Sequence, residues 1–304
     1  MTTTSVQTMR EPYLVIDDFL PIAVAGQMRR DIENPYNRPI ASLGDVNTCL
    51  ETPPEKVIQR QHLELFMDVL RSWSATRLGL REVTWPSLRV YIDGCQQPLH
   101  NDAGNGRFGF VYSLTRDRRR TTGGQTILLR EGDLFRRNIG AARARSDFVD
   151  AIEPRFNRLV VFDERLPHGV GRVDGSMDPV EGRVALHGCL QVAGPTVAGT
   201  LAEQQVGAIV AAAWSDFIKA AAARVRLYHG SVVARLEINA LGQVDACTLL
   251  MDRVIATDAA DIGWPKLAAE LVARLKQCRF AEAAGPTVVI QPFLVGETFT
   301  RPQP

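Results

Sequence analysis

One stretch, residues 89–114, constrains the fold more than any other part of the chain. It contains a β-type run, a turn with Gly and Pro, and a second run rich in aromatic residues. His100 and Asp102 stand between the two runs, one residue apart. Side chains at positions i and i+2 of a strand point to the same face, so this spacing directs an imidazole and a carboxylate towards one point. The stretch therefore predicts a β-rich fold in which these two side chains act together.

His168 is the third candidate for a shared metal site. It follows another apolar run and is one of only five histidines in the chain. Two imidazoles and one carboxylate that leave other coordination positions open are the ligand set of non-heme Fe(II) oxygenases. Such a set leaves the metal with residual positive charge, which favours an anionic co-substrate. The plain alternative is that each histidine fills a structural place in the core or on the surface.

Arg183 lies on the β-type run that follows His168. A guanidinium on such a strand needs acceptors for its five donors, because a buried and unpaired charge is costly. The carboxylate of a dicarboxylic co-substrate would pair with it in bidentate fashion, and a salt bridge to a nearby Asp or Glu is the alternative. Tyr91, on the run that enters the motif, could direct its hydroxyl to the same co-substrate or to water.

Composition sets the broad class of protein. The chain has 304 residues, is 45% hydrophobic and 23% charged, and carries a net charge of +1. These values are typical of a soluble protein with two domains and give no reason to expect a nucleic-acid or membrane partner. Five scattered cysteines without a CxxC motif favour a reducing compartment. We find no signal-like segment and no apolar run that approaches membrane-spanning length, so we expect a cytoplasmic protein.

The order of apolar patterns predicts two domains. Short β-type runs separated by turns indicate an antiparallel barrel or sandwich, and helical spacing within residues 21–32 and 57–78 predicts flanking N-terminal helices. A linker-like AGPTVAG segment at 193–199 precedes an α-β-β-α-β succession. We therefore expect a mainly β domain over residues 1–193 and a small α+β domain over residues 200–304.

The first domain resembles 2-oxoglutarate- and Fe(II)-dependent oxygenases of the prolyl-hydroxylase-like branch, over residues 11–192. The matching blocks are RVYIDGCQQPLHNDAGNGRFGFVYSL, GGQTILL, FNRLVVFDERLPHGV and GRVALHGCL. The resemblance implies a double-stranded β-helix, or jelly roll. It implies that His100, Asp102 and His168 bind iron. It also implies that Arg183 pairs with the distal carboxylate of 2-oxoglutarate.

The same resemblance implies further co-substrate contacts and a reaction. Tyr91 matches a position that touches 2-oxoglutarate, and Tyr112 and Ser113 straddle another. The implied reaction hydroxylates an unactivated C–H bond of an amino acid, peptide or natural product, with O2 as oxidant and with release of succinate and CO2. Ascorbate is an implied supporting reductant. The carboxylate of Asp102 favours hydroxylation over halogenation, while desaturation and ring closure stay open.

The chain departs from the family pattern in two places. The segment DGSMDP is inserted between His168 and Arg183, which makes Arg172 a rival anchor for the co-substrate. His187 stands where an apolar or hydroxyl residue is commoner, and we expect it to point outward on its strand.

A cluster of arginines occupies the two segments between the metal-bearing runs. In a jelly roll these segments would border the mouth of the pocket and could recognise an acidic or carboxylate-bearing substrate. The alternative is a solvated lid that maintains solubility. No aromatic residues interleave with the arginines, so nucleic acid is not expected. The cluster consists of Arg116, Arg118, Arg119, Arg120, Arg136, Arg137, Arg143 and Arg145.

The C-terminal segment, residues 200–297, resembles the C-terminal domains of TonB and of AgmX/PglI-type proteins. The shared points are Gly230 before a long strand, Gly242 in a hairpin turn, a helix ending near Phe280, and a closing strand with Phe293. The resemblance suggests a module for homodimerisation or substrate docking. Two alternative functions follow: a hydroxylase of peptides or proteins that are docked by this domain, and a non-catalytic metal-binding jelly roll.

Overall fold

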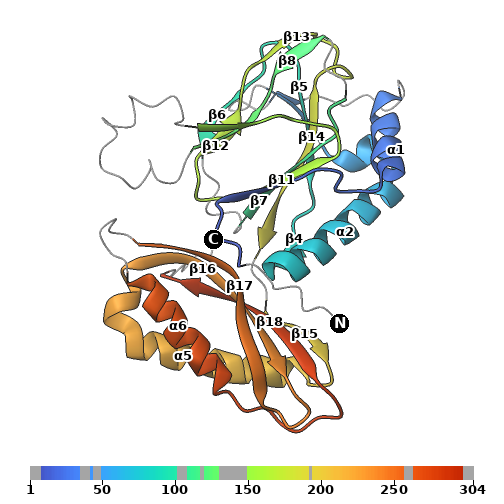
Figure 1. Cartoon of the computed structure of the whole chain (residues 1–304). Coiled ribbons are helices and arrows are strands. Elements are labelled where there is room, and N and C mark those ends of the chain that lie inside the picture. The colour runs from blue at the N-terminus through green and yellow to red at the C-terminus, as the bar shows by residue number, and fades with distance from the viewer. Residues whose placement is uncertain are drawn as a thin grey trace. The chain divides into compact units, whose positions relative to one another are not determined.

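The computed structural model describes residues 8–34, 49–100, 108–116, 120–129, 149–191, 194–256 and 263–296, and the backbone of 42–43 (Figure 1). Among the expected functional residues, those outside these ranges are Asp102, Arg118, Arg119, Arg136, Arg137, Arg143 and Arg145.

The chain divides into two compact units, and neither is contiguous in the sequence. The first unit consists of residues 12–72 and 82–191. The second consists of residues 1–11, 73–81 and 192–304.

The first unit is mainly β. Its helices are α1 (Ile22–Glu33), a short 3-10 helix (Pro54–Lys56) and the first part of α2 (Arg60–Leu78). Its strands are β1 (Tyr13–Ile16), β2 (Ser42–Leu43), β3 (Leu50–Thr52), β4 (Glu82–Val83), β5 (Ser87–Tyr91), β6 (Gln97–His100), β7 (Phe108–Ser113), β8 (Thr121–Gly123), β9 (Thr126–Leu129), β10 (Val149–Ile152), β11 (Arg158–Asp163), β12 (His168–Val170), β13 (Val173–Gly175) and β14 (Arg183–Gln191).

These strands form antiparallel sheets, as the sequence predicted. The large sheet has the order β1-β11-β7-β14-β5-β3-β2, with β4 paired to β14. A four-stranded sheet has the order β10-β9-β12-β6, and β13 pairs with β8. The expected N-terminal helices are present, and α2 packs on the large sheet, where the Phe66 and Tyr112 rings stack at 4.8 Å between centroids.

Strand alternation decides which side chains face the small sheet. Val111 of β7 and Phe162 of β11 do so and join Leu128 of β9 in an apolar cluster. Gly109 makes room for this packing, because a Cβ atom there would lie 2.7 Å from two ring carbons of Phe162. Val111 and Phe162 also line the cavity described below.

The second unit is an α+β structure. Its antiparallel sheet has the order β15-β18-β16-β17, and apolar side chains of two helices, such as Phe217 and Leu271, join its core. The likeness to TonB and AgmX/PglI-type domains stays a prediction. The elements are β15 (Thr196–Gly199), α5 (Glu203–Val225), β16 (Tyr228–Ile238), β17 (Val244–Ala256), α6 (Trp264–Lys276) and β18 (Thr287–Val295).

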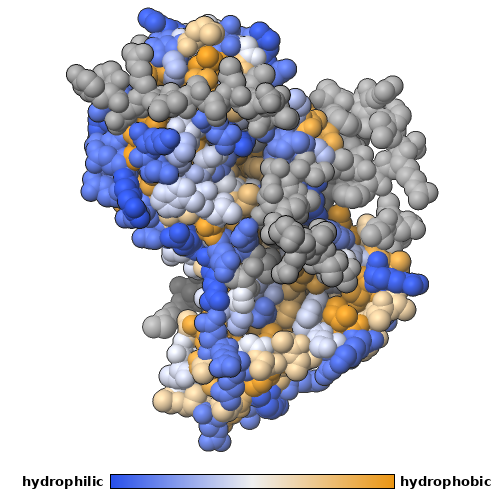
Figure 2. Space-filling model, turned by 180° about the vertical axis from the view of Figure 1, so that it is seen from behind, coloured by the Kyte–Doolittle hydropathy of each residue, from blue (hydrophilic) through white to orange (hydrophobic). Residues whose placement is uncertain are grey.

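Helix α5 corrects the expectation that no apolar run approaches membrane-spanning length. Among the described residues it is the one helix that is long and apolar enough, by length and composition, to cross a membrane. A helix that packs one face on a sheet can meet the same two criteria, and α5 buries residues at helical intervals from Val206 to Val225. Seen from behind, the surface of the second unit mixes hydrophobic and hydrophilic residues (Figure 2).

Candidate active site

His100 and His168 face each other across neighbouring strands. They are Cα partners in the pairing of β6 with β12, and their ring centroids lie 4.4 Å apart. The Nδ1 atom of His100 lies 2.9 Å from the carbonyl oxygen of Pro98, and that of His168 lies 3.0 Å from the carbonyl oxygen of Leu166. A carbonyl oxygen only accepts, so in the neutral imidazole Nδ1 carries the proton and Nε2 is the accepting nitrogen.

This arrangement is typical of histidines that bind a metal. An imidazole that donates its other N–H to a backbone carbonyl is held in one tautomer and one orientation. Asp102 lies two residues beyond His100, outside the described ranges. Within those ranges no group of three His, Cys, Asp or Glu side chains could hold a metal ion. The structure thus positions two of the three expected ligands, and Asp102 as the third stays a prediction.

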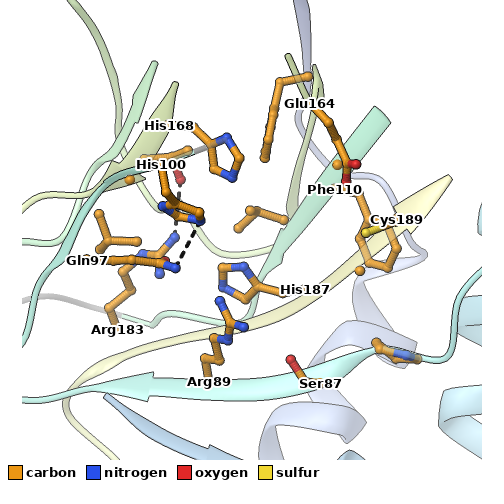
Figure 3. Close-up of a pocket in the computed structure, with 18 of the residues that line it drawn as sticks. Ser87, Arg89, Gln97, His100, Phe110, Glu164, His168, Arg183, His187 and Cys189 are labelled. Carbon is orange, nitrogen blue, oxygen red and sulfur yellow. Dashed lines mark hydrogen bonds between the residues drawn. The ribbon is translucent and has the colours of Figure 1, made fainter. Parts of the chain in front are cut away.

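The two histidines line a cavity of ≈ 240 Å³ between the large sheet and the β10-β9-β12-β6 sheet (Figure 3). Its walls come from β5, β7, β11 and β14 on one side and from β6, β9 and β12 on the other. The ionisable side chains of the lining are Arg89, His100, Glu164, His168, Arg183, His187 and Cys189.

Arg183 is buried at this cavity, with only 2% of its surface exposed. Its Nη2 donates to Thr126 Oγ1 over 3.2 Å, and its Cζ lies 4.8 Å from the centroid of the Tyr91 ring. Its Nε and Nη1 are buried without an acceptor among the described residues. Burial lowers the pKa of Arg183, and Tyr91 opposes this shift. A buried guanidinium with two donors that lack acceptors is suited to binding an anionic ligand, which would accept from both donors.

The rival anchor, Arg172, lies outside the cavity. Its side chain is 58% exposed, and its Nε donates to Asp174 Oδ1 over 2.7 Å. Arg172 therefore forms an ordinary salt bridge with Asp174, which is the kind of partner that was the alternative for Arg183.

Tyr91 does not line the cavity but supports two residues that do. Its ring covers the Arg183 guanidinium, and its hydroxyl donates to Gln97 Oε1 over 3.1 Å. The amide nitrogen of Gln97 in turn lies 3.2 Å from His100 Nε2. Burial raises the pKa of Tyr91 to about 12, although Arg183 opposes the shift. Gln97 thus links Tyr91 to the first histidine.

The sequence did not indicate Gln97. Simple alternation would place Gln97 and His100, three residues apart, on opposite faces of a strand. The pairing of β6 with β12 is irregular between His168 and Val170, and this irregularity accompanies the contact between the Gln97 and His100 side chains.

Tyr112 is not brought to the cavity, which corrects the expected co-substrate contact. It lies on the face of β7 that packs on Phe66, and its hydroxyl donates to Asn157 Oδ1 over 2.7 Å. Ser113 is buried, and its Oγ accepts from the Thr115 N–H over 3.3 Å. Neither residue is part of the cavity lining.

His187 and Arg89 line the cavity, and the expectation that His187 points outward is wrong. Residues i and i+4 of a strand share a face, so an inward Arg183 places His187 inward too. Ala185 lies between Arg183 and His187 on the same face of β14. Its register partner on β5 is Arg89, which therefore faces the cavity as well. Alternation along the two strands was the signal that could have identified both residues.

No family model and no curated protein matches the chain. Among solved structures, the chain is similar to a prolyl hydroxylase in complex with a hypoxia inducible factor oxygen degradation domain peptide fragment from Trichoplax adhaerens, with 18% identity, a TM-score of 0.41, and coverage of 58% of this chain and 81% of that one. It is also similar to a Pseudomonas putida prolyl-4-hydroxylase, with 16% identity, a TM-score of 0.41, and coverage of 59% and 92%. Both neighbours are prolyl hydroxylases.

Proposed function

We propose that the first unit is a jelly-roll oxygenase that uses Fe(II) and 2-oxoglutarate. One observation carries the proposal: two histidines, each with its Nδ1 against a backbone carbonyl oxygen, line the same cavity as a buried arginine whose Nε and Nη1 have no acceptor among the described residues. A metal ion would bind Nε2 of His168 and Nε2 of His100, at His100 in place of the contact with the Gln97 amide. The distal carboxylate of the co-substrate would accept from Nε and Nη1 of Arg183.

The residues present fit both groups. Two neutral imidazoles, with Asp102 as the proposed third ligand, suit Fe(II) and leave positions open for other ligands. A dicarboxylate would give the buried charge of Arg183 the partner that the described protein does not supply. When bound, the iron and 2-oxoglutarate supply the oxidising chemistry, in which O2 is consumed, succinate and CO2 are released, and a substrate C–H bond is hydroxylated.

The protein's own part is to bind, to orient and to exclude water. Carbonyl oxygens of Pro98 and Leu166 fix the tautomer of the two histidines. The Tyr91 ring and the Thr126 hydroxyl hold the Arg183 guanidinium in place. On the apolar side, the Phe162 ring lies 4.5 Å from the His168 ring, centroid to centroid. This packing limits the access of water to one side of His168.

An anaerobic titration tests the proposal. Metal-free full-length protein receives Fe(II) and then 2-oxoglutarate, and the visible charge-transfer band of the chelate is followed. We expect a band in the wild type, none in His168→Ala, and a far higher 2-oxoglutarate requirement in Arg183→Leu. Arg172→Leu is the matched control, because this exposed arginine should titrate as the wild type does. Folded wild-type protein that binds iron but gives no band would refute the 2-oxoglutarate assignment.

A further inference from the structure

The cavity holds a second cationic side chain that neither the iron nor the co-substrate assignment uses. Arg89 lies on β5 and pairs in register with Ala185, two residues along β14 from Arg183. Two residues of a strand span about 6.6–6.8 Å. Figure 3 shows the Arg89 guanidinium pointing into the cavity towards His187. Two guanidinium groups therefore reach one cavity from adjacent strands.

The described part of the protein only partly neutralises Arg89. Its Nε is buried without a hydrogen-bond acceptor there. Its ion pair with Glu51 is long, at 3.5 Å from Nε to Oε1, and the Glu51 side chain is 38% exposed, so solvent weakens the pair. Although burial opposes the charge, Tyr91 and Glu51 favour it, and the pKa of Arg89 is raised. Arg89 is thus a charged side chain with an N–H donor that has no acceptor among the described residues.

Exposure separates the two arginines along the cavity. Arg183 is 2% exposed and lies beside the fully buried Tyr91. The Arg89 side chain is 20% exposed, and Trp85, which also lines the cavity, is 46% exposed. The Arg183 end is therefore closed, and the end beyond Arg89 opens to solvent.

The charge and size of the cavity restrict what can occupy the open end. Among the described lining residues, Glu164 is the one acid, against Arg89 and Arg183. The distal carboxylate of a co-substrate would neutralise Arg183 and leave Arg89 for a second anion. The volume of ≈ 240 Å³ lies below the about 300–1,000 Å³ of pockets for drug-sized ligands. The co-substrate would occupy part of this volume, so the rest of the cavity has room for one small group of the second molecule.

We propose that Arg89 binds a carboxylate of the primary substrate, so that the enzyme acts on small carboxylate-bearing molecules and not on uncharged internal segments of a peptide. This inference rests on the proposed function and adds its substrate class. Ser87 and His187, which are register partners at the cavity beyond Arg89, provide further polar groups around such a substrate.

A binding experiment without turnover tests the inference. Full-length protein is loaded with Mn(II) and 2-oxoglutarate under anaerobic conditions. It is then screened by thermal shift against paired probes: free L-amino acids, 2-hydroxy acids and short peptides, each as the acid and as its primary amide. We expect acids to raise the melting temperature and their amides to fail. In Arg89→Gln, the affinity for the best acid should fall about 10- to 100-fold, while 2-oxoglutarate affinity stays within about twofold of the wild-type value.

Two further variants sharpen the result. Arg89→Lys should recover part of the affinity for the acid, and Arg172→Gln should bind as the wild type does. Equal binding of acids and amides, or no acid-dependent shift at all, overturns the inference while 2-oxoglutarate binding remains. Arg89→Gln that weakens 2-oxoglutarate as much as Arg183→Gln does would assign Arg89 to the co-substrate and also overturn it. Wild-type protein that binds no 2-oxoglutarate would overturn the proposed function itself.

Discussion

The guanidinium of Arg183 lies over the ring of Tyr91, with Cζ 4.8 Å from the ring centroid, while its Nε and Nη1 have no acceptor among the described residues. Burial of an arginine in this way costs stability, because the ring compensates only part of the lost hydration. The pair is therefore arranged for a ligand and not for the stability of the empty protein.

This relationship predicts opposite effects of Arg183→Met on stability and on binding. Methionine keeps the apolar stem and a sulfur contact with the ring. It removes the guanidinium, whose pKa is lowered because burial disfavours its charged form. We expect the free energy of unfolding of the ligand-free protein to rise by about 1 kcal/mol or more. Binding of 2-oxoglutarate should weaken by about 2–5 kcal/mol. Urea unfolding and calorimetric titration measure the two effects, and a loss of stability without ligand would contradict the account.

Two tyrosine variants separate the site from the core. Tyr91→Phe leaves the ring on Arg183 but deprives Gln97 Oε1 of its donor, so we expect weaker 2-oxoglutarate binding together with a stability loss of about 1 kcal/mol. Tyr112→Phe removes one of the two donors to Asn157 Oδ1 and leaves the Leu20 N–H as the other, and it should cost similar stability without any change in binding. If Tyr112→Phe weakens 2-oxoglutarate binding as much as Tyr91→Phe does, the placement of Tyr112 in the core is wrong.

Alkaline titration offers a test by pH. Burial raises the pKa of Tyr91 from 10.0 to about 12 and raises that of Tyr112 as well. Above pH 10 the unfolded chain therefore loses phenolic protons that the native protein keeps, so stability falls as pH rises from about 10 towards 12. Of the five tyrosines in the chain, we expect these two to ionise only as the protein unfolds. Phenolate absorbance followed alongside circular dichroism measures this, and full ionisation before unfolding would contradict it.

A glycine pair tests the second unit. Gly242 has φ 73°, and a Cβ atom there would lie 2.1 Å from the carbonyl oxygen of Phe280. We expect Gly242→Ala to reduce the free energy of unfolding by about 1–3 kcal/mol. Gly207 in α5 is the control, because its Cβ would meet only Pro195 at 3.8 Å, and alanine there should add about 0.5–1 kcal/mol. Urea denaturation measures the free energy of unfolding of both variants. Equal stabilities would refute the claim that the backbone conformation and close contact at Gly242 require glycine.

The sequence predicted those features that depend on local pattern. Alternation and spacing indicated the strands that bear His100, His168 and Arg183, and the structure brings these three side chains to one cavity. The contact between Gln97 and His100 accompanies an irregular register, which apolar patterning does not reveal. The face of Tyr112 depends on the packing of α2 against the sheet. Alternation from Arg183 was sufficient to place His187 inward, and the rarity of histidine at such a position obscured it.

The sequence pattern also could not predict that residues 73–81 belong to the second unit. Apolar residues recur at helical spacing through α2 without a break, yet the contacts of its last turns group with the C-terminal segment. A Cβ atom on Gly79 would meet the Val233 side chain at 2.3 Å and that of Ile290 at 2.8 Å. Such long-range packing is set by the tertiary structure and leaves no periodic signal.

The most direct test of the central claim is a crystal structure of the protein prepared anaerobically with Fe(II) and 2-oxoglutarate, with the metal located by anomalous scattering at the iron edge. We predict one iron bound by Nε2 of His100, Nε2 of His168 and the carboxylate of Asp102. The distal carboxylate of 2-oxoglutarate should accept from Nε and Nη1 of Arg183. Iron bound away from the two histidines, or a dicarboxylate that leaves Arg183 without a partner, would contradict the account.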